Sequence, residues 1–456
     1  MPQGARSSAC LNSQNRAEDR KKGHDMENFE HKYDVLIAGT GVAGLCCALN
    51  LPRDMRVLML TKAAADESDS FLAQGGICML RGEEDFRGYF DDTLRAGHYE
   101  NDAAAVEQMI RLYPAMIAEL VECGVEFARD EEGNFRFTRE GGHSRPRILF
   151  HDDITGKEIT GKLLALVRTL PNVRIAERAE LIDIIAENGE CFGGVVRSAG
   201  GKLTDVYANF TLLATGGVGG LFENSTNFRH LTGDSLAIAL KNGVEVEHLD
   251  YVQIHPTTFY SERQGRRFLI SESVRGEGAV LLDREGNRFC NELMPRDVVT
   301  GDIRAQMKKE GSKFVRLDMR PVGEKTIREH FPTIYAHCLE EGYDVLKEPI
   351  PVVPAQHYFM GGVKVDLDGR TSMKRLFSAG ETACNGVHGK NRLASNSLLE
   401  SLIWAERAAK AMAAERKNAI GRYPVPEHSG YEDYAALKQN YAKIIREEAE
   451  KEATID

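Results

Sequence analysis

The run GTGVAG at residues 39–44 limits the possible folds of this chain more than any other segment. A short apolar run at residues 33–38 precedes it, a helical pattern at 45–51 follows, and a second β-rich run occupies 56–61. Glycines in such a turn permit a tight bend, close approach of a pyrophosphate and contact between helix and strand. The free N–H groups at the helix start favour the phosphates. The segment therefore predicts a βαβ dinucleotide-binding unit, with a glycine-rich turn that binds nothing as the alternative.

The end of the second predicted strand departs from the usual dinucleotide-binding pattern. An acid is expected there to bind a ribose, but the strand ends in Thr61 and Lys62. This difference disfavours a nicotinamide dinucleotide. Near its other end the chain couples Arg392 to a polar turn, Ser395 to Ser397, that opens a helix. A chain that returns to its first domain to complete a cofactor site is typical of large flavoproteins.

Two features of this late segment have two interpretations each. Residues 376–381 predict a strand that ends in Glu381, which either contacts the cofactor or is a solvated turn acid. The helix that starts near Asn396 could direct its N–H groups at a flavin carbonyl, or its serines could simply cap it, and both can hold.

The composition narrows the class of protein. A net charge of −11 argues against a nucleic-acid binder, although a few arginines in a cleft can still attract an anionic substrate. The nine cysteines include no Cys-x-x-Cys pair, so we expect no zinc or iron–sulfur site and reduced thiols in a cytoplasmic protein. We find no apolar run of 18 residues and therefore expect no membrane span.

The length of 456 residues predicts two or three domains. The pattern changes between residues 247 and 356, where polar loops and helical segments near 297–309 and 324–342 suggest an inserted α+β capping domain. Met26 is the expected working start, so the residues before it are disordered or an artefact. The expected divisions are a disordered extension at 1–30, a cofactor domain in two parts at 31–246 and 357–424, the cap at 247–356, and a charged helical tail at 425–456.

Basic side chains in loops suggest a dicarboxylate site. Arg296 and Arg392 could each bind one carboxylate through two hydrogen bonds, and His255 and His357 could add donors. A lone histidine is more often structural, but both are expected in loops next to proline or glycine. The glycine-rich segment 138–147 is a solvated loop when taken alone, or equally a lid that carries Glu140 to a substrate ammonium.

These residues together resemble the succinate dehydrogenase/fumarate reductase flavoprotein superfamily, and within it the aspartate-oxidising branch. The resemblance extends from about residue 33 to about residue 412. It rests on segments that occur in the same order: 39–44, 70–77, 139–144, 147–148, 253–256, 271–272, 275–278, 295–299, 354–358, 361–362, 378–381 and 391–400. It implies an α/β FAD-binding Rossmann-like domain of the glutathione-reductase type, with an inserted α+β capping domain and a short C-terminal helical tail.

The resemblance also implies roles for individual residues. Arg296 would be catalytic through proton transfer, and Glu140, His255, Ser271, His357 and Arg392 would bind substrate. Non-covalent attachment is implied because Asp69 stands where relatives carry the histidine that links FAD. The residues implied to contact FAD are Gly39, Thr40, Gly41, Val42, Ala43, Gly44, Lys62, Asp69, Ser70, Phe71, Leu72, Ala73, Gln74, Gly75, Gly76, Asp234, Glu381, Ser397 and Leu398.

The activity implied by the resemblance is oxidation of L-aspartate to iminosuccinate, with oxygen or fumarate as electron acceptor. This reaction opens NAD biosynthesis through quinolinate, so hand-off of iminosuccinate to quinolinate synthase is expected, without a nucleic-acid or membrane partner. The alternatives are a soluble fumarate reductase or succinate dehydrogenase-type flavoprotein, a flavoprotein that delivers electrons to a partner, and an inactive paralogue. The chain departs from the family pattern at Ser271, where threonine is usual, at Gly301, where arginine is frequent, and in its shorter C-terminal helical region.

Overall fold

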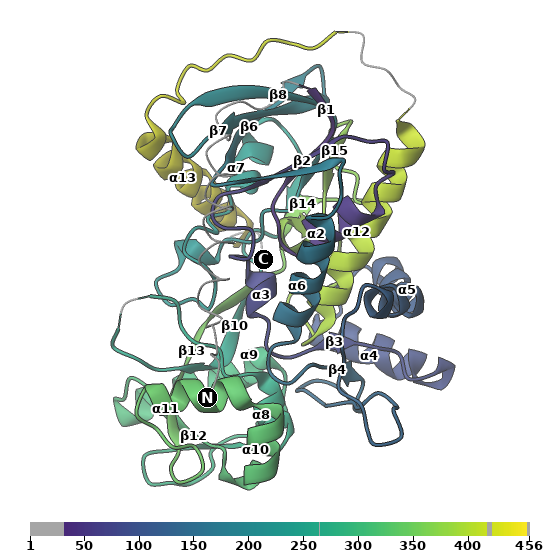
Figure 1. Cartoon of the computed structure of the whole chain (residues 1–456). Coiled ribbons are helices and arrows are strands. Elements are labelled where there is room, and N and C mark those ends of the chain that lie inside the picture. Colours follow the sequence, from purple (N-terminus) through teal and green to yellow (C-terminus); the bar gives the residue numbers. More distant parts are fainter. Residues whose placement is uncertain (1–31, 264, 417–421, 454–456) are drawn as a thin grey trace, which may run out of the picture.

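The computed structural model describes residues 32–263, 265–416 and 422–453, so the predicted N-terminal extension and Met26 lie outside the described residues. A seven-stranded sheet forms the upper half of the molecule (Figure 1). Its strand order is β5-β2-β1-β8-β7-β6, and β15 pairs with the second half of β8. The strands are β1 (Lys32–Ala38), β2 (Val57–Thr61), β5 (Val173–Glu177), β6 (Glu180–Glu187), β7 (Glu190–Arg197), β8 (Leu203–Leu213) and β15 (Leu376–Ser378).

The centre of this sheet is the predicted βαβ unit. Strand β1 pairs in parallel with β2 and with β8, and its apolar residues are buried on both faces. Three residues, 39–41, separate the end of β1 from the start of helix α2 (Val42–Asn50). Gly39 has φ +118°, and a Cβ there would lie 1.9 Å from the carbonyl oxygen of Ala214, so only glycine fits the turn. The prediction of strand, turn, helix and strand is confirmed.

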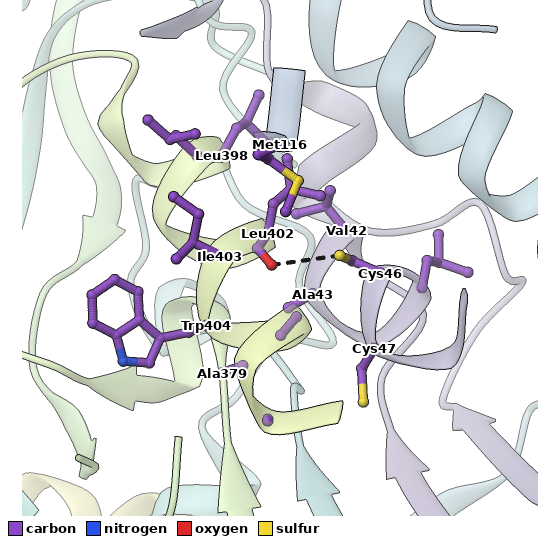
Figure 2. Packing of buried hydrophobic residues seen from close by; sticks show 14 of the residues in the cluster. Val42, Ala43, Cys46, Cys47, Met116, Ala379, Leu398, Leu402, Ile403 and Trp404 are labelled. Atoms are coloured by element: carbon purple, nitrogen blue, oxygen red, sulfur yellow. Dashed lines mark hydrogen bonds between the residues drawn. The ribbon is translucent and has the colours of Figure 1, made fainter. Parts of the chain in front are cut away.

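Helix α12 (Asn396–Glu415) brings the end of the chain back to this unit. It packs against α2 across a buried apolar cluster that also includes Met116 of α5 (Figure 2). The Sγ of Cys46 donates to the carbonyl oxygen of Leu402 at 3.4 Å, and Trp404 is fully buried. The segment that begins at Asn391 is therefore fixed to the nucleotide-binding unit by core packing.

Other helices and short strands surround the sheet. They are α3 (Asp69–Leu72), α4 (Phe86–Ala96), α5 (Ala103–Glu122), α6 (Thr155–Val167), α7 (Asp234–Lys241), β3 (Ile77–Cys78), β4 (Ile148–Leu149), β9 (Val246–Glu247), β14 (Gly362–Lys364), β16 (Ala383–Cys384), and the 3-10 turns η1 (Glu83–Asp85), η2 (Gly219–Leu221) and η4 (Gly380–Thr382). Helix α13 (Tyr434–Ala453) packs against α7 beside the β6–β7 hairpin (Figure 1).

A second sheet, antiparallel and of four strands, forms the lower half in the order β10-β13-β12-β11. It has its own apolar core, and the predicted helices near 297–309 and 324–342 are present there. The predicted boundary at residue 356 falls inside β13. The elements are β10 (Val252–Phe259), β11 (Val280–Leu282), β12 (Val315–Asp318), β13 (Ile350–Phe359), α8 (Glu272–Gly276), α9 (Arg296–Glu310), α10 (Glu324–His330), α11 (Pro332–Glu340) and η3 (Arg320–Val322). No helix among the described residues is long and apolar enough to cross a bilayer.

Candidate active site

One cavity is lined by almost all of the residues that the sequence predicted for the site. It is lined by the turn after β1, the loop around α3, the start of α7, residues of β10, α9 and β13, and the start of α12. All of the predicted site residues line it except Gly44 and Phe71. Gly44 is buried within α2, and Phe71 packs against the apolar core. Segments distant in the sequence therefore meet at a single cavity.

The middle of the cavity has the donor and acceptor set that a dinucleotide needs. Ser70 Oγ accepts from the backbone N–H of Val42 at 3.1 Å, which joins the glycine turn to the α3 loop. Three polar atoms of that loop are buried without a partner among the described residues: Ser68 Oγ, Asp69 Oδ2 and Gln74 Oε1. Buried polar groups normally find partners, so these atoms fit a polar ligand such as FAD.

The N-terminus of helix α12 lies at the cavity and has no side-chain cap. Its N-cap residue Ser395 adopts a left-handed conformation, with φ 62°, and its hydroxyl does not bond to the helix N–H groups. It instead donates to Glu140 and accepts from the N–H of Gly76 at 3.2 Å. The alternative of ordinary serine capping is therefore wrong for Ser395, and the helix start keeps free N–H groups for a ligand.

Two acids beside the α3 loop have raised pKa values. Burial, and then the charge of Asp69, raise the pKa of Glu381 to about 8. Its Oε1 accepts from the N–H of Phe359 at 2.9 Å. Burial also raises the pKa of Asp69 to about 7, although its Oδ1 accepts from the N–H of Phe228 at 3.0 Å. Glu381 lines the cavity and is not a solvated turn acid.

At the end of the cavity near β2, charges occur in opposite pairs. Lys62 contacts the Oδ2 of Asp234 and lies 3.5 Å from Glu180 Oε1. Lys438 of α13 contacts the Oδ1 of Asp234 and lies 2.9 Å from Glu180 Oε1. Burial alone would raise the pKa of Asp234, but Lys62 and Lys438 lower it to about 2. Asp234 is therefore a carboxylate throughout the neutral range.

The opposite end of the cavity is built around two arginines. Arg296 Nε donates to Glu272 Oε2 at 2.5 Å, and Arg296 Nη1 donates to Gln253 Oε1 at 2.7 Å. Arg392 Nε donates to the same Gln253 oxygen at 3.3 Å, and its Nη1 donates to Ser397 Oγ at 2.5 Å. Burial, and then the charge of Arg296, lower the pKa of Arg392 to about 10. Both arginines bond the same oxygen of Gln253, so their two positive charges favour an anionic ligand between them.

His255 and His357 lie edge to face beside the arginines, with ring centroids 5.1 Å apart. The Nδ1 of His357 lies 2.8 Å from Thr226 Oγ1, and the Nδ1 of His255 lies 3.0 Å from the carbonyl oxygen of Thr257. Burial, and then Arg296, lower the pKa of both imidazoles well below the usual value. The neutral rings offer hydrogen bonds, and the Nε2 of His255 has no partner among the described residues.

Glu140 lies in the same part of the cavity. Its Oε1 accepts from Ser273 Oγ at 2.8 Å and its Oε2 from Ser395 Oγ at 2.6 Å. A Cβ at Gly75 would lie 2.5 Å from Glu140 Oε1, so glycine allows the α3 loop to pass close to this carboxylate. Burial, and then the charge of Glu272, raise the pKa of Glu140. A cation bound here would relieve both effects.

The segment that carries Glu140 is held by a buried network. Arg147 pairs with Asp85 at 3.0 Å and with Asp92 at 2.6 Å, and all three side chains are almost completely buried. Arg147 also donates to His143 Nδ1 at 3.0 Å, so neutral His143 donates from Nε2 to the carbonyl oxygen of Ala394, also at 3.0 Å. The solvated-loop alternative for this segment therefore does not hold at Glu140, His143 or Arg147.

Several residues near the arginines were not identified as site residues from the sequence. Gln253 bridges the two arginines, Glu272 orients Arg296, Ser273 bonds Glu140, and the ring of Tyr358 lies 4.3 Å from the Arg392 guanidinium. Gln253 and Glu272 are buried polar residues within segments that already carried the resemblance, which was an available signal. Ser273 lies outside those segments, so the sequence offered no signal for its role.

Comparison with known proteins places this chain in a family. A family model described as an FAD binding domain matches residues 34–398, which makes FAD the cofactor. L-aspartate oxidase of Clostridium perfringens is 50% identical over 82% of this chain and 85% of its own length. L-aspartate oxidase of Clostridium acetobutylicum is 47% identical over 83% of this chain and 87% of its own.

Solved structures agree at the level of the superfamily. A variant of quinol fumarate reductase FrdA from E. coli matches with a TM-score of 0.80 and 28% identity over 90% of this chain and 74% of that one. Sdh1 of Mycobacterium smegmatis matches with a TM-score of 0.74 and 30% identity over 89% and 72%. The predicted resemblance to the succinate dehydrogenase/fumarate reductase flavoproteins is confirmed, and the chain belongs to the L-aspartate oxidase family within them.

Proposed function

We propose that this protein oxidises L-aspartate to iminosuccinate with FAD and passes the electrons to oxygen or fumarate. One observation carries the proposal: the buried carboxylate of Glu140 and the guanidinium groups of Arg296 and Arg392 line the same end of the cavity. An amino dicarboxylate has the complementary charges, since its ammonium pairs with an acid and its carboxylates with cations.

Each side chain has a defined task in this proposal. Arg392, His357 and His255 bind the substrate carboxylates, and Ser271 adds a hydroxyl. Glu140 accepts hydrogen bonds from the substrate ammonium and so fixes the Cα–H bond toward the cofactor. When bound, FAD would supply the hydride acceptor for Cα, and the substrate nitrogen would first lose a proton to solvent. Holding the reacting atoms in line lowers the activation free energy by roughly several kcal/mol.

Arg296 lines the same cavity and is oriented by Glu272 and Gln253. A guanidinium is in general a poor base, so we assign Arg296 proton donation to carbon in the fumarate-reducing direction and charge stabilisation in aspartate oxidation. Reoxidation by oxygen would yield hydrogen peroxide, and reoxidation by fumarate would yield succinate.

We also propose that the four-stranded sheet and α8–α11 form a capping domain over an FAD domain of the glutathione-reductase type, with α13 as the C-terminal helical tail. Residues 69–76 would contact FAD without a covalent bond, because an aspartate cannot form the histidyl link. Acid precipitation should therefore release all of the flavin into the supernatant. A cytoplasmic location and transfer of iminosuccinate to quinolinate synthase complete the proposal.

Substitution of Glu140 by Gln tests the assignment of substrate. Glutamine keeps the shape but removes the charge that pairs with the ammonium. We expect kcat/KM for L-aspartate to fall by a factor of roughly 10 to 100, as for a charged hydrogen bond, while fumarate reduction by a chemical electron donor changes less than threefold. Equal losses on aspartate and fumarate would refute the role of Glu140 and favour a fumarate reductase.

A further inference from the structure

Helix α13 extends to the nucleotide-binding end of the cavity from outside the FAD-binding match, which stops at residue 398. Its Lys438 pairs with two acids that line the cavity, Glu180 and Asp234. The side chain of Lys438 is 20% exposed and that of Asp234 is 4% exposed. Burial opposes the charge on Lys438, but Asp234 and Glu180 raise its pKa, so the lysine stays an ammonium.

The two lysines hold the Asp234 carboxylate from two sides. Lys62 contacts the Oδ2 atom and Lys438 contacts the Oδ1 atom, to which Thr232 Oγ1 also donates at 3.0 Å. A carboxylate has about four acceptor positions, so these contacts fix its orientation and still leave acceptor capacity. The orientation of Asp234 therefore depends on a residue of α13.

The Asp234 carboxylate lies near the end of β2, where this chain lacks the acid that is usual in dinucleotide-binding domains. The residue after β2 normally provides a carboxylate for a ribose hydroxyl, and here that place is taken by Lys62. Lys62 in turn binds Asp234, the first residue of α7, and so brings a carboxylate to the same end of the cavity. The acid is supplied by another element, and it needs cationic partners to be held there.

The rest of α13 keeps Lys438 in place. Tyr434 donates to Glu180 Oε2 at 2.6 Å, and Tyr441 donates to the carbonyl oxygen of Ile182 at 2.6 Å. Ile445 packs so close to α7 that a Cβ on Gly233 would lie 3.0 Å from its Cδ1. Figure 1 shows the helix beside α7 and the β6–β7 hairpin. Lys438 is therefore presented by a helix with fixed contacts along three turns.

We propose that α13 retains the cofactor: Lys438 is a positioning residue that orients Asp234 to accept hydrogen bonds from the ribose of the adenosine half of FAD. This inference rests on the proposed contact between Asp234 and FAD. It assigns to the C-terminal helix a role in cofactor affinity and not in aspartate recognition.

The test is FAD affinity of the full-length apoprotein, measured by flavin fluorescence titration. Lys438→Ala should weaken FAD binding by a factor of roughly 10 to 100, which is the usual effect of a lost charged hydrogen bond. Lys438→Arg should stay within about threefold of the unsubstituted protein. Lys443→Ala is the matched control, since Lys443 lies on the same helix, is 69% exposed and pairs with Glu447 of that helix at 3.6 Å.

Separate titrations with ADP and with FMN locate the effect. We expect Lys438→Ala to weaken ADP binding and to leave FMN binding unchanged. Equal FAD affinity in Lys438→Ala and Lys443→Ala would overturn the inference, as would an equal loss of ADP and FMN. Tyr434→Phe provides a second variant if Lys438→Ala does not fold, and it should weaken ADP binding by a smaller factor. FAD binding without aspartate oxidation would refute the proposed function and leave this inference standing.

Discussion

The two ends of the cavity hold their charges in opposite ways. Near β2, Lys62 and Lys438 face Glu180 and Asp234, so every charge has an opposite neighbour. Near α9, Arg296 pairs with Glu272, but Arg392 donates to the neutral oxygens of Gln253 and Ser397, and the neighbouring imidazoles are neutral. The adenosine part of a dinucleotide is neutral and needs only fixed hydrogen-bond partners. A dicarboxylate instead needs cations whose positive charge it can neutralise.

This difference explains why the arginine end tolerates charge repulsion. Arg296 lowers the pKa of Arg392, and Glu272 raises that of Glu140, so the site holds like charges close together before substrate binds. Bound carboxylates and an ammonium would relieve both repulsions. Such groups, held before the reaction, stabilise charge in the transition state without further rearrangement.

Arg296→Lys should have the largest effect, and it tests whether the arginine end depends on geometry as well as charge. Lysine keeps the charge but cannot bond Glu272 and Gln253 in the same fork. We expect kcat for L-aspartate to fall by roughly 100- to 1,000-fold, with FAD still bound. Steady-state kinetics on the flavin-loaded variant measure this. Arg304→Lys, on the exposed face of the same helix, is the control, and a loss below tenfold would contradict the account.

Asp69→Asn tests the region between the two ends, where burial raises the pKa of two acids. The folded-state pKa values of Asp69 and Glu381, about 7 and about 8, lie above the ordinary values of 3.8 and 4.5. Their contribution to stability is therefore complete below about pH 4 and is lost as the pH rises toward 8. The substitution should reduce this loss by roughly 2 kcal/mol.

Urea unfolding of the apoprotein at pH 5 and pH 8 measures the effect. The free energy of unfolding should fall less between these pH values in Asp69→Asn than in the unsubstituted protein. Asp66→Asn, at an exposed neighbouring position, should keep the original dependence on pH. An identical dependence in all three proteins would show that the pKa of Asp69 is not raised as described.

Ser271 gives the smallest expected effect and refines the description of the arginine end. Its Oγ accepts from the N–H of Ser273 at 3.3 Å and caps α8. Ser271→Ala should lower the free energy of unfolding by about 1 kcal/mol and raise the KM for aspartate about threefold. Ser271→Thr keeps the hydroxyl and should match the unsubstituted protein in both thermal melts and KM. A threonine variant as impaired as the alanine variant would contradict the capping role.

The sequence predicted the parts of the site that depend on local geometry. The strand, glycine turn and helix at residues 33–51 follow from local sequence, because a short apolar run that meets a glycine-rich turn and then a helical pattern is typical of a βαβ unit. The contact between Lys62 and Asp234 and the bridge made by Gln253 were not predicted as such. They join segments far apart in the chain, and no local pattern records which distant side chains will meet.

Conformation also limited the prediction at Ser395. A polar run before an apolar helix ordinarily predicts capping, since a serine hydroxyl can bond the first N–H groups. In the structure a left-handed backbone turns this hydroxyl to Glu140 instead. The prediction missed this because the competing partner, a buried carboxylate, comes from another segment.

The most direct test of the account is reduction of the bound flavin under anaerobic conditions. The purified protein would be mixed with L-aspartate or with succinate while the visible flavin absorption is followed, and oxygen or fumarate would then be added. We predict bleaching by L-aspartate and not by succinate, with recovery on addition of either acceptor. Bleaching by succinate and not by L-aspartate would contradict the role of Glu140 and the proposed function.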